Sequence, residues 1–165
     1  MKLALGIDPG IATTGYGVIR LLDDGGLQAV TFGVLVTPPN LPVQERLLLL
    51  YGDLRALLAE HHPDTCAVEK LFFQRNVSTA IAVGEARGVV MLTMAEARVP
   101  VSEYTPNEVK QAVAGYGSAQ KRQVQEMVRA LLGLPDIPRP DDAADALAIA
   151  ITHLNTTHYE DTVPG

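Results

Sequence analysis

Four carboxylates in three separate segments have the types and spacing that metal-dependent phosphodiester chemistry requires. Asp8 and Glu69 each end an apolar stretch, and Asp142 and Asp145 lie in an alanine-rich segment. Acids in such surroundings are costly to bury unless an opposite charge neutralises them. Hard oxygen ligands suit Mg²⁺ or Mn²⁺. The sequence therefore predicts a divalent-metal site that hydrolyses a phosphodiester.

Each of these acids also has an ordinary explanation. Asp8 precedes a Pro-Gly turn, and Glu69 fits an exposed acid at the end of a strand. Asp142 and Asp145 share one face near the start of a predicted helix, where the helix dipole favours negative charge. These explanations are independent of one another, whereas a metal site accounts for all four acids at once.

Hydrophobic periodicity and turn residues predict the elements that would position the acids. Alternating apolar residues predict three sequential antiparallel strands, at residues 3–8, 15–21 and 27–37. Helical spacing, together with short apolar runs, then predicts helices at residues 42–61, 78–98, 106–114, 118–132 and 141–154 and strands at residues 65–69 and 100–104. Ser118 is the predicted N-cap of its helix.

This order predicts an α/β fold with a mixed five-stranded sheet and helices packed on both faces. It matches the ribonuclease H-like arrangement, in which the first and fourth strands are neighbours, so Asp8 and Glu69 are expected to meet. Residues 1–154 form the predicted nuclease domain. Residues 155–165 are polar and lack periodicity, which predicts a mobile C-terminal tail.

Composition limits the class of protein. The chain has 165 residues, 47% of them hydrophobic, and Cys66 is its single cysteine. It has no membrane-length apolar run and no signal-peptide pattern, so we expect a cytoplasmic protein without a membrane partner. The net charge is −6, yet residues 70–129 carry eight Lys/Arg against five Asp/Glu. This local excess fits nucleic-acid binding, and ordinary solvated helix faces fit it equally well.

Several motifs together resemble the RuvC family of bacterial Holliday junction resolvases, over residues 1–154. They are GIDPG at residues 6–10, VE at 68–69, GEARG at 84–88, VKQ at 109–111, GSAQK at 117–121 and DAADALAIAITH at 142–153. The set is specific, although Asp-Pro-Gly alone would carry no weight.

The resemblance implies an acidic tetrad, formed by Asp8, Glu69, Asp142 and Asp145, that is catalytic and holds two Mg²⁺ ions, with Mn²⁺ as a substitute. It implies a homodimer that grips four-way junction DNA and makes paired symmetric nicks in homologous recombination and DNA repair. It also implies work beside a branch-migration complex of the RuvA and RuvB type.

The resemblance further implies a set of DNA contacts: Phe72, Arg75, Asn76, Lys110, Lys121 and Arg122. Phe72 would stack against the exchange point of the junction, as aromatic side chains do on unpaired bases. Both Phe72 and Phe73 could instead be core residues. Lys110 and Lys121 match family lysines near the scissile strand, and Lys121 is also a predicted catalytic residue. Either lysine could instead be merely solvated.

Small residues at Ala80, Gly84 and Gly88 form a ridge on one predicted helix. The resemblance places this ridge at the dimer interface, while packing on the helix's own sheet explains it as well. Three rival functions remain at this stage. They are half of an actin-like kinase, tested by ATP binding; a non-catalytic junction scaffold, disfavoured by the intact tetrad; and a nuclease for flaps or RNA–DNA hybrids, tested by comparing substrates.

Overall fold

The computed structural model describes residues 1–70 and 76–163 and contains one five-stranded sheet within them, in the order β3-β2-β1-β4-β5. The strands are β1 (Lys2–Asp8), β2 (Thr13–Leu21), β3 (Leu27–Val36), β4 (Thr65–Glu69) and β5 (Val101–Tyr104). β1 pairs antiparallel with β2 and parallel with β4. The predicted mixed sheet and the predicted neighbouring of the first and fourth strands are confirmed.

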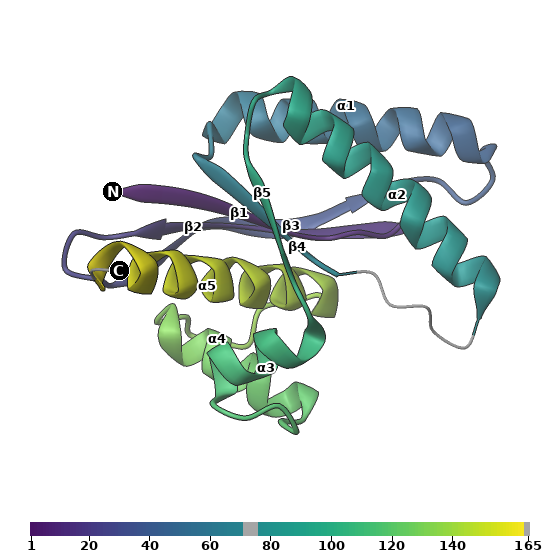
Figure 1. The fold of residues 1–165 in the computed structure, drawn as a ribbon. Helices are drawn as coiled ribbons and strands as arrows, with labels where there is room; N and C mark the ends of the chain where they lie inside the picture. Colours follow the sequence, from purple (N-terminus) through teal and green to yellow (C-terminus); the bar gives the residue numbers. More distant parts are fainter. Residues whose placement is uncertain (71–75, 164–165) are drawn as a thin grey trace.

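Helices cover both faces of this sheet, as Figure 1 shows. α1 (Val43–His61) and α2 (Val77–Glu96) pack together on one face. α5 (Asp141–Thr162) lies directly on the other face, with α3 (Pro106–Ala114) and α4 (Lys121–Leu131) packed against it. The predicted ribonuclease H-like α/β arrangement is therefore confirmed.

The alternation of side chains along β1 decides which face receives the acid. Leu5 and Ile7 are fully buried in the core beneath α1 and α2. Ala4 packs in the opposite core, and Gly6 lies against the backbone of α5. Because strand side chains alternate, Asp8 points to the α5 side with Ala4 and Gly6. The sheet therefore directs Asp8 toward the helix that carries the other two aspartates.

Helix α5 continues to Thr162, so the predicted end of this helix at residue 154 is wrong. Residues 155–162 contain neither glycine nor proline. The hydroxyls of Thr156, Thr157 and Thr162 hydrogen-bond to carbonyls four residues earlier, which keeps those side chains along the helix. Apolar periodicity does not detect a helix that extends past the core. The mobility of this segment stays a prediction.

Two other helix starts differ from the expected ones because nearby side chains cap them. α4 begins at Lys121, and Gln120 rather than Ser118 is its N-cap, since the Gln120 backbone N–H donates to Gln123 Oε1 at 2.8 Å. α2 begins at Val77 with Asn76 as its N-cap. Glutamine is an uncommon cap, so the sequence pointed to the serine.

Helix α2 is also the one helix in the described part of the chain that is long and apolar enough to cross a membrane by length and composition. Core helices of soluble proteins meet the same criterion. α2 contributes Ala86, Val90 and Met94 to the core shared with α1, and these three side chains are fully buried. Its hydropathy is thus partly explained by packing against α1 and the sheet.

Candidate active site

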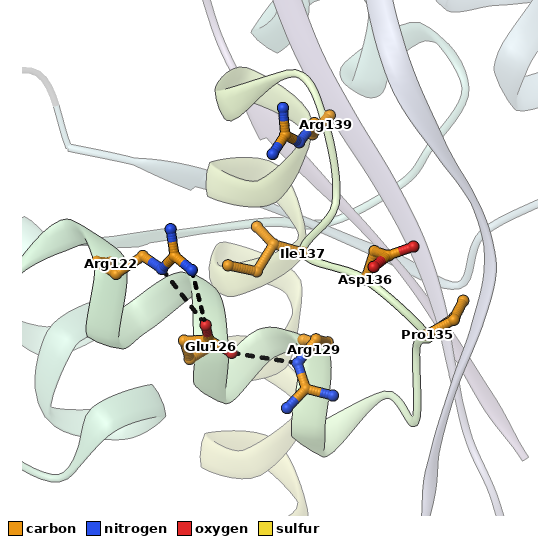
Figure 2. A pocket seen from close by; sticks show the side chains of 7 residues that line it. All are labelled: Arg122, Glu126, Arg129, Pro135, Asp136, Ile137 and Arg139. Carbon is orange, nitrogen blue, oxygen red and sulfur yellow. Dashed lines mark hydrogen bonds and ion pairs between the residues drawn. The ribbon is translucent and has the colours of Figure 1, made fainter.

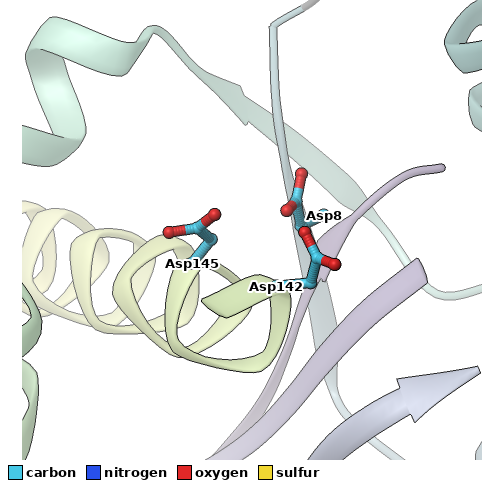
Figure 3. Close-up of side chains that lie close together, drawn as sticks. All are labelled: Asp8, Asp142 and Asp145. Atoms are coloured by element: carbon cyan, nitrogen blue, oxygen red, sulfur yellow. The ribbon is translucent and has the colours of Figure 1, made fainter. Parts of the chain in front are cut away.

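Three of the four predicted acids converge at one end of the central strand β1. Asp8 ends β1, while Asp142 and Asp145 occupy the first turns of α5. One carboxylate oxygen from each of the three lies within 4.8 Å of the others, as Figure 3 illustrates. Residues more than 130 positions apart in the sequence are thereby brought to the spacing of ligands around a single divalent cation.

Glycines on β1 and β2 allow α5 to approach the sheet this closely. Asp8 pairs with Gly15, and Gly6 pairs with Gly17, across the two strands. A Cβ atom on Gly15 would lie 1.9 Å from the Asp142 carbonyl oxygen. Such a distance is impossible, so only glycine fits. The role of these glycines in seating α5 was not predicted from the sequence, although their alternation on one strand face was a readable signal.

Gly6 makes the same close approach one helical turn further along α5. A Cβ atom there would lie 2.1 Å from the Ala146 carbonyl oxygen and 2.9 Å from the Ala150 Cβ atom. The alanines of α5 complement the strand glycines, because both elements are free of bulk where they touch. The alanine-rich composition around the two aspartates is thus a packing requirement of the site.

Glu69 lies beside the cluster formed by Asp8, Asp142 and Asp145 but does not belong to it. It ends β4, the parallel neighbour of β1. With Lys110, Lys121 and Asp145 it lines a pocket of about 310 Å³. The floor of this pocket is apolar and consists of Pro106, Val109, Val124, Ala148 and Ile149. The structure therefore brings all four acids to one end of the sheet, three of them in immediate proximity.

Burial and mutual repulsion dominate the electrostatics of the acids. Burial raises the pKa of Asp8 to about 8, and the charges of Asp145, Asp142 and Glu69 add to this rise. The pKa of Asp145 is also raised, by burial first, while Lys121 opposes the rise. Burial and Asp145 raise the pKa of Glu69, and Lys110 lowers it. The oxygen donors and their uncompensated negative charge fit Mg²⁺ or Mn²⁺.

Lys121 connects the cluster to the neighbouring acid Asp141. Its Nζ atom lies 3.2 Å from Asp141 Oδ2 and 3.8 Å from Asp145 Oδ2. Asp141 also accepts a hydrogen bond of 3.2 Å from the Gln125 side chain. Asp141 is therefore engaged with α4, whereas Asp142 belongs to the three-carboxylate group. This difference favours Asp142 over Asp141 as the metal ligand.

A sequence model of the family "Crossover junction endodeoxyribonuclease RuvC" matches residues 4–153. The chain belongs to the RuvC family. A RuvC protein from Chloroflexus aggregans is 61% identical over 153 residues, which is 93% of each chain. The structure of T. thermophilus RuvC in complex with a Holliday junction substrate superposes with a TM-score of 0.92 at 40% identity, covering 97% of both chains.

A more distant structure shares the fold of the RuvC family. The yeast mitochondrial Holliday junction resolvase Ydc2 has a TM-score of 0.69 at 18% identity, covering 97% of this chain and 84% of its own. The resemblance inferred from the sequence motifs is confirmed by the RuvC match. The RuvC match, rather than the rival actin-like kinase, accounts for the strand-end acid Asp8 and the Pro-Gly turn after it.

The predicted DNA contacts have different outcomes in this RuvC-family structure. Phe72 and Arg75 lie outside the described residues, as does Phe73. The Asn76 side-chain oxygen accepts hydrogen bonds from the backbone N–H groups of Ser78 and Thr79, at 3.0 and 3.4 Å. Asn76 therefore has a structural role as an N-cap, and its contact with DNA stays a prediction.

The other three predicted DNA contacts, Lys110, Lys121 and Arg122, lie within the described part of the chain. Lys110 and Lys121 line the pocket beside Glu69 and Asp145. Arg122 is adjacent on α4, with 74% of its side chain exposed, and it pairs with Glu126. The two lysines thus lie beside Glu69 and Asp145, while Arg122 lines neighbouring hollows, one of which extends to Asp142.

A buried histidine near the middle of α5 anchors that helix to two strands. His153 is 2% exposed, and its ring nitrogens hydrogen-bond to Thr65 Oγ1 at 2.8 Å and to the Tyr104 hydroxyl at 2.7 Å. Burial lowers the pKa of His153 to about 4, so the ring is neutral at neutral pH. This network connects α5 to β4, which carries Glu69, and to the neighbouring strand β5.

The raised pKa values predict how the metal-free protein responds to pH. Asp8 has a pKa of about 8 in the folded chain and 3.8 as its ordinary value, so the folded state holds an extra proton between these values. The free energy of unfolding should therefore fall as pH rises from 4 to 8 in EDTA, and Asp145 and Glu69 act in the same direction.

Urea unfolding of wild type and Asp8→Asn at pH 5 and pH 8 checks this prediction. Groups outside the acid cluster titrate in the same way in both proteins, so the difference between them reports Asp8 and its coupling to the neighbouring acids. Asp8→Asn should lose less stability between the two pH values than wild type does. Equal losses in the two proteins would show that Asp8 is not held in a repulsive, desolvated setting.

Proposed function

We propose that the protein is a structure-selective endonuclease that resolves four-way DNA junctions by paired symmetric nicks, through two-metal-ion phosphodiester hydrolysis. The observation that carries the proposal is the convergence of Asp8, Asp142 and Asp145 within 4.8 Å, beside Glu69 and two lysines. The 40% identical T. thermophilus RuvC, whose structure contains a Holliday junction substrate, supports the choice of DNA.

The four acids would hold the divalent cations. When bound, these ions supply charge stabilisation at the scissile phosphate and a nucleophilic water at neutral pH. Burial raises the pKa values of Asp8 and Asp145, and bound cations would oppose this rise by favouring the ionised carboxylates. Mg²⁺ is the proposed physiological ion, and Mn²⁺ is expected to substitute because both prefer oxygen ligands.

The two lysines bind and orient the phosphate. Lys121 is held by Asp141 and Asp145, with 57% of its side chain exposed, so its ammonium group remains open to an incoming phosphate. Lys110 lies across the same pocket beside Glu69. An ammonium near the reacting oxygens also stabilises negative charge that develops there, which is the proposed catalytic part of Lys121.

The direct test is incubation with a synthetic four-way junction and Mg²⁺, analysed on a denaturing gel. Two nicks at symmetric positions in strands of like polarity are the expected result. A flap, a linear duplex and an RNA–DNA hybrid of the same sequence serve as comparison substrates. Equal cleavage of these substrates would favour a plain nuclease, and junction binding without any cleavage would favour a scaffold.

Removing either lysine should weaken junction binding and reduce its salt dependence. Each lost phosphate contact should lower the slope of log affinity against log salt by about 0.9. Lys110→Ala and Lys121→Ala are compared with Lys2→Ala, which lies at the far end of β1 from Asp8. Fluorescence anisotropy gives the slopes, and single-turnover cleavage shows whether the rate falls more than binding. A slope and a rate equal to those of Lys2→Ala would mean that the lysine is only solvated.

We also propose a homodimer, because two paired nicks need two active sites. The supporting surface is an exposed apolar row on α2, in which Val77, Ile81 and Leu92 are 70%, 57% and 58% exposed. Gly84 and Gly88 continue the row at helical spacing, and Gly88 faces open space. Ala80 is only 8% exposed in the single chain and offers little surface to a partner.

Gly84→Leu should therefore weaken the dimer before it harms the monomer. The larger side chain would hold the two copies of α2 apart. Light scattering over a range of concentrations, with melting temperature as the control for folding, measures both effects. A wild-type protein that is monomeric at micromolar concentration would contradict the proposal, and an unchanged dimer in Gly84→Leu would move the interface elsewhere.

The remaining proposals concern cellular context and the segment after Glu69. A cytoplasmic role in recombination and repair, beside a branch-migration complex of the RuvA and RuvB type, follows from the family. Phe72 is the proposed aromatic at the exchange point, with Arg75 and Asn76 on the adjacent backbone. These assignments rest on the motif match alone.

A further inference from the structure

Three arginines surround a hollow on the outer side of α4, next to the candidate active site. Arg122 and Arg129 lie on α4, and Arg139 lies on the segment that leads into α5. Figure 2 shows the three guanidinium groups placed around the side chain of Ile137. The hollow has a volume of about 720 Å³. We call it the arginine groove and define it by Arg122, Arg129, Arg139 and Ile137.

Glu126 holds two of these arginines in position without using all their donors. Arg122 bonds to Glu126 Oε1 through Nε at 3.3 Å and Nη2 at 3.2 Å, and Arg129 bonds to Oε2 through Nε at 3.2 Å. The hydrogen bond from Arg129 is the main cause that lowers the pKa of Glu126, so this carboxylate is ionised at neutral pH. Among the residues that the structure describes, no hydrogen bond engages the Nη1 group of Arg122 or the two Nη groups of Arg129.

Arg139 completes the groove from a stiff segment. It lies between Pro138 and Pro140, whose rings fix their own backbone angles. Within residues 1–70 and 76–163, no hydrogen bond or ion pair engages its guanidinium group. The segment is further fixed by a hydrogen bond of 2.9 Å from the Leu134 N–H to the Arg129 carbonyl. Arg139 is therefore presented with all its donors free.

The groove is continuous with the catalytic acids. A second hollow of about 630 Å³ shares Arg122, Ile137 and Arg139 with the first, and it extends to Asp141 and Asp142. A strand whose scissile phosphate lies at the acids could thus place its neighbouring phosphates along the arginines. Guanidinium groups are well matched to phosphate because they offer paired donors in a plane.

We infer that the arginine groove holds backbone phosphates of the DNA strand adjoining the cut, and that Arg129 and Arg139 are DNA-positioning residues. The inference rests on the proposed function and names the path of the substrate. The groove also contains Glu126 and Asp136, so its three cations exceed its anions by one. Glu126 is occupied by the arginines that it orients. The excess positive charge and the shared boundary with Asp142 favour a phosphate strand over an acidic protein segment.

The test removes two positive charges from the arginine groove and compares the effect with the removal of two positive charges elsewhere on the protein. The double variant Arg129→Gln/Arg139→Gln is matched by Arg20→Gln/Arg55→Gln, which removes two cations outside the groove and the acid cluster. Junction affinity is measured by anisotropy from low to high salt. The groove variant should lose about 1.8 from the log–log slope, which is roughly 60-fold in affinity at 0.1 M salt. The matched control should keep the slope of wild type.

Junctions in which single backbone phosphates are replaced by uncharged groups identify the phosphates that the arginine groove contacts. Junctions carrying single methylphosphonates at successive positions beside the cut should bind wild type more weakly at one or two positions. Methylphosphonates at those positions should not lower the affinity of the groove variant any further, because that variant lacks the arginines that contact these phosphates. Arg139→Gln alone repeats the measurement without disturbing the Glu126 pairs, so a folding defect in the double variant cannot hide the answer.

The measurements distinguish a wrong groove inference from a wrong proposed function. If wild type cleaves the junction with Mg²⁺ and the groove variant has the same slope and methylphosphonate profile as wild type, the groove inference is wrong and the proposed function stands. If wild type neither binds nor cleaves the junction, both are wrong. An unchanged slope together with lost binding of an acidic partner protein would assign the groove to that protein and overturn the DNA assignment.

Discussion

Asp8→Asn is expected to abolish junction cleavage while leaving junction binding and folding intact. Asp8 is the acid on which burial and all three neighbouring carboxylates act together. Its replacement removes one charge from the cation-binding set, and bound cations contribute several kcal/mol to the transition state. A loss of about 4 kcal/mol corresponds to roughly a thousandfold in rate. Glu69→Gln, Asp142→Asn and Asp145→Asn should each have effects of similar size.

Asp141→Asn provides the matched control for this prediction. It lies on the same helix turn as Asp142 but belongs to the pairs with Lys121 and Gln125. Its cleavage rate should fall by less than tenfold, through loosened positioning of Lys121. Single-turnover rates and Mn²⁺ titration by calorimetry measure chemistry and metal binding separately. Near-normal turnover in Asp8→Asn would remove Asp8 from the metal site, and a thousandfold loss in Asp141→Asn would place Asp141 within it.

The Asp8→Asn variant should gain stability in EDTA at pH 8. Its amide carries no charge to be repelled by Asp142, Asp145 and Glu69, whereas the wild-type carboxylate is partly ionised near its pKa of about 8. Catalysis and stability are therefore expected to change in opposite directions. Such opposition is typical of sites in which strain or repulsion serves function. A destabilised Asp8→Asn protein would show that Asp8 supports the fold rather than opposing it.

Gly15→Ala should slow cleavage strongly through packing, without changing any acid. The new Cβ atom would lie 1.9 Å from the carbonyl oxygen of Asp142 and 2.4 Å from its carbonyl carbon. Both are backbone atoms, so the first turn of α5 has to move away from β2. A displacement of about 1 Å can cost about a hundredfold in rate. Overpacking in the core typically costs about 1–3 kcal/mol of stability.

Gly52→Ala is the control for the loss of a glycine. A Cβ atom at this position of α1 meets nothing within 4 Å, so this variant should keep its activity and gain about 0.5–1 kcal/mol of helix stability. Cleavage rate, Mn²⁺ affinity and urea unfolding are measured for both variants. If Gly15→Ala retains wild-type Mn²⁺ affinity and cleavage, the close seating of α5 on β2 is not what holds Asp142 at the metal site.

Patterns within short segments were sufficient to predict the order of the elements. Alternation in β1 and helical spacing in α1 reflect burial on one side, and burial is what the sheet and its covering helices impose. The acids were also recognisable, because Asp8 closes an apolar strand and Asp142 stands in an alanine-rich segment. Helix ends were predicted less well, since the caps at Asn76 and Gln120 depend on individual side-chain bonds.

The sequence by itself determined the types of the candidate metal-binding acids, the α/β order and the motifs that mark the RuvC family. Only the tertiary structure decided how closely α5 lies on Gly6 and Gly15, and hence that Asp8 meets Asp142 and Asp145. It alone placed Arg139 opposite Arg129 across one groove. The physical reason is that local patterns report which side of an element is buried. Distances between elements depend instead on the bulk of side chains that meet from distant parts of the chain.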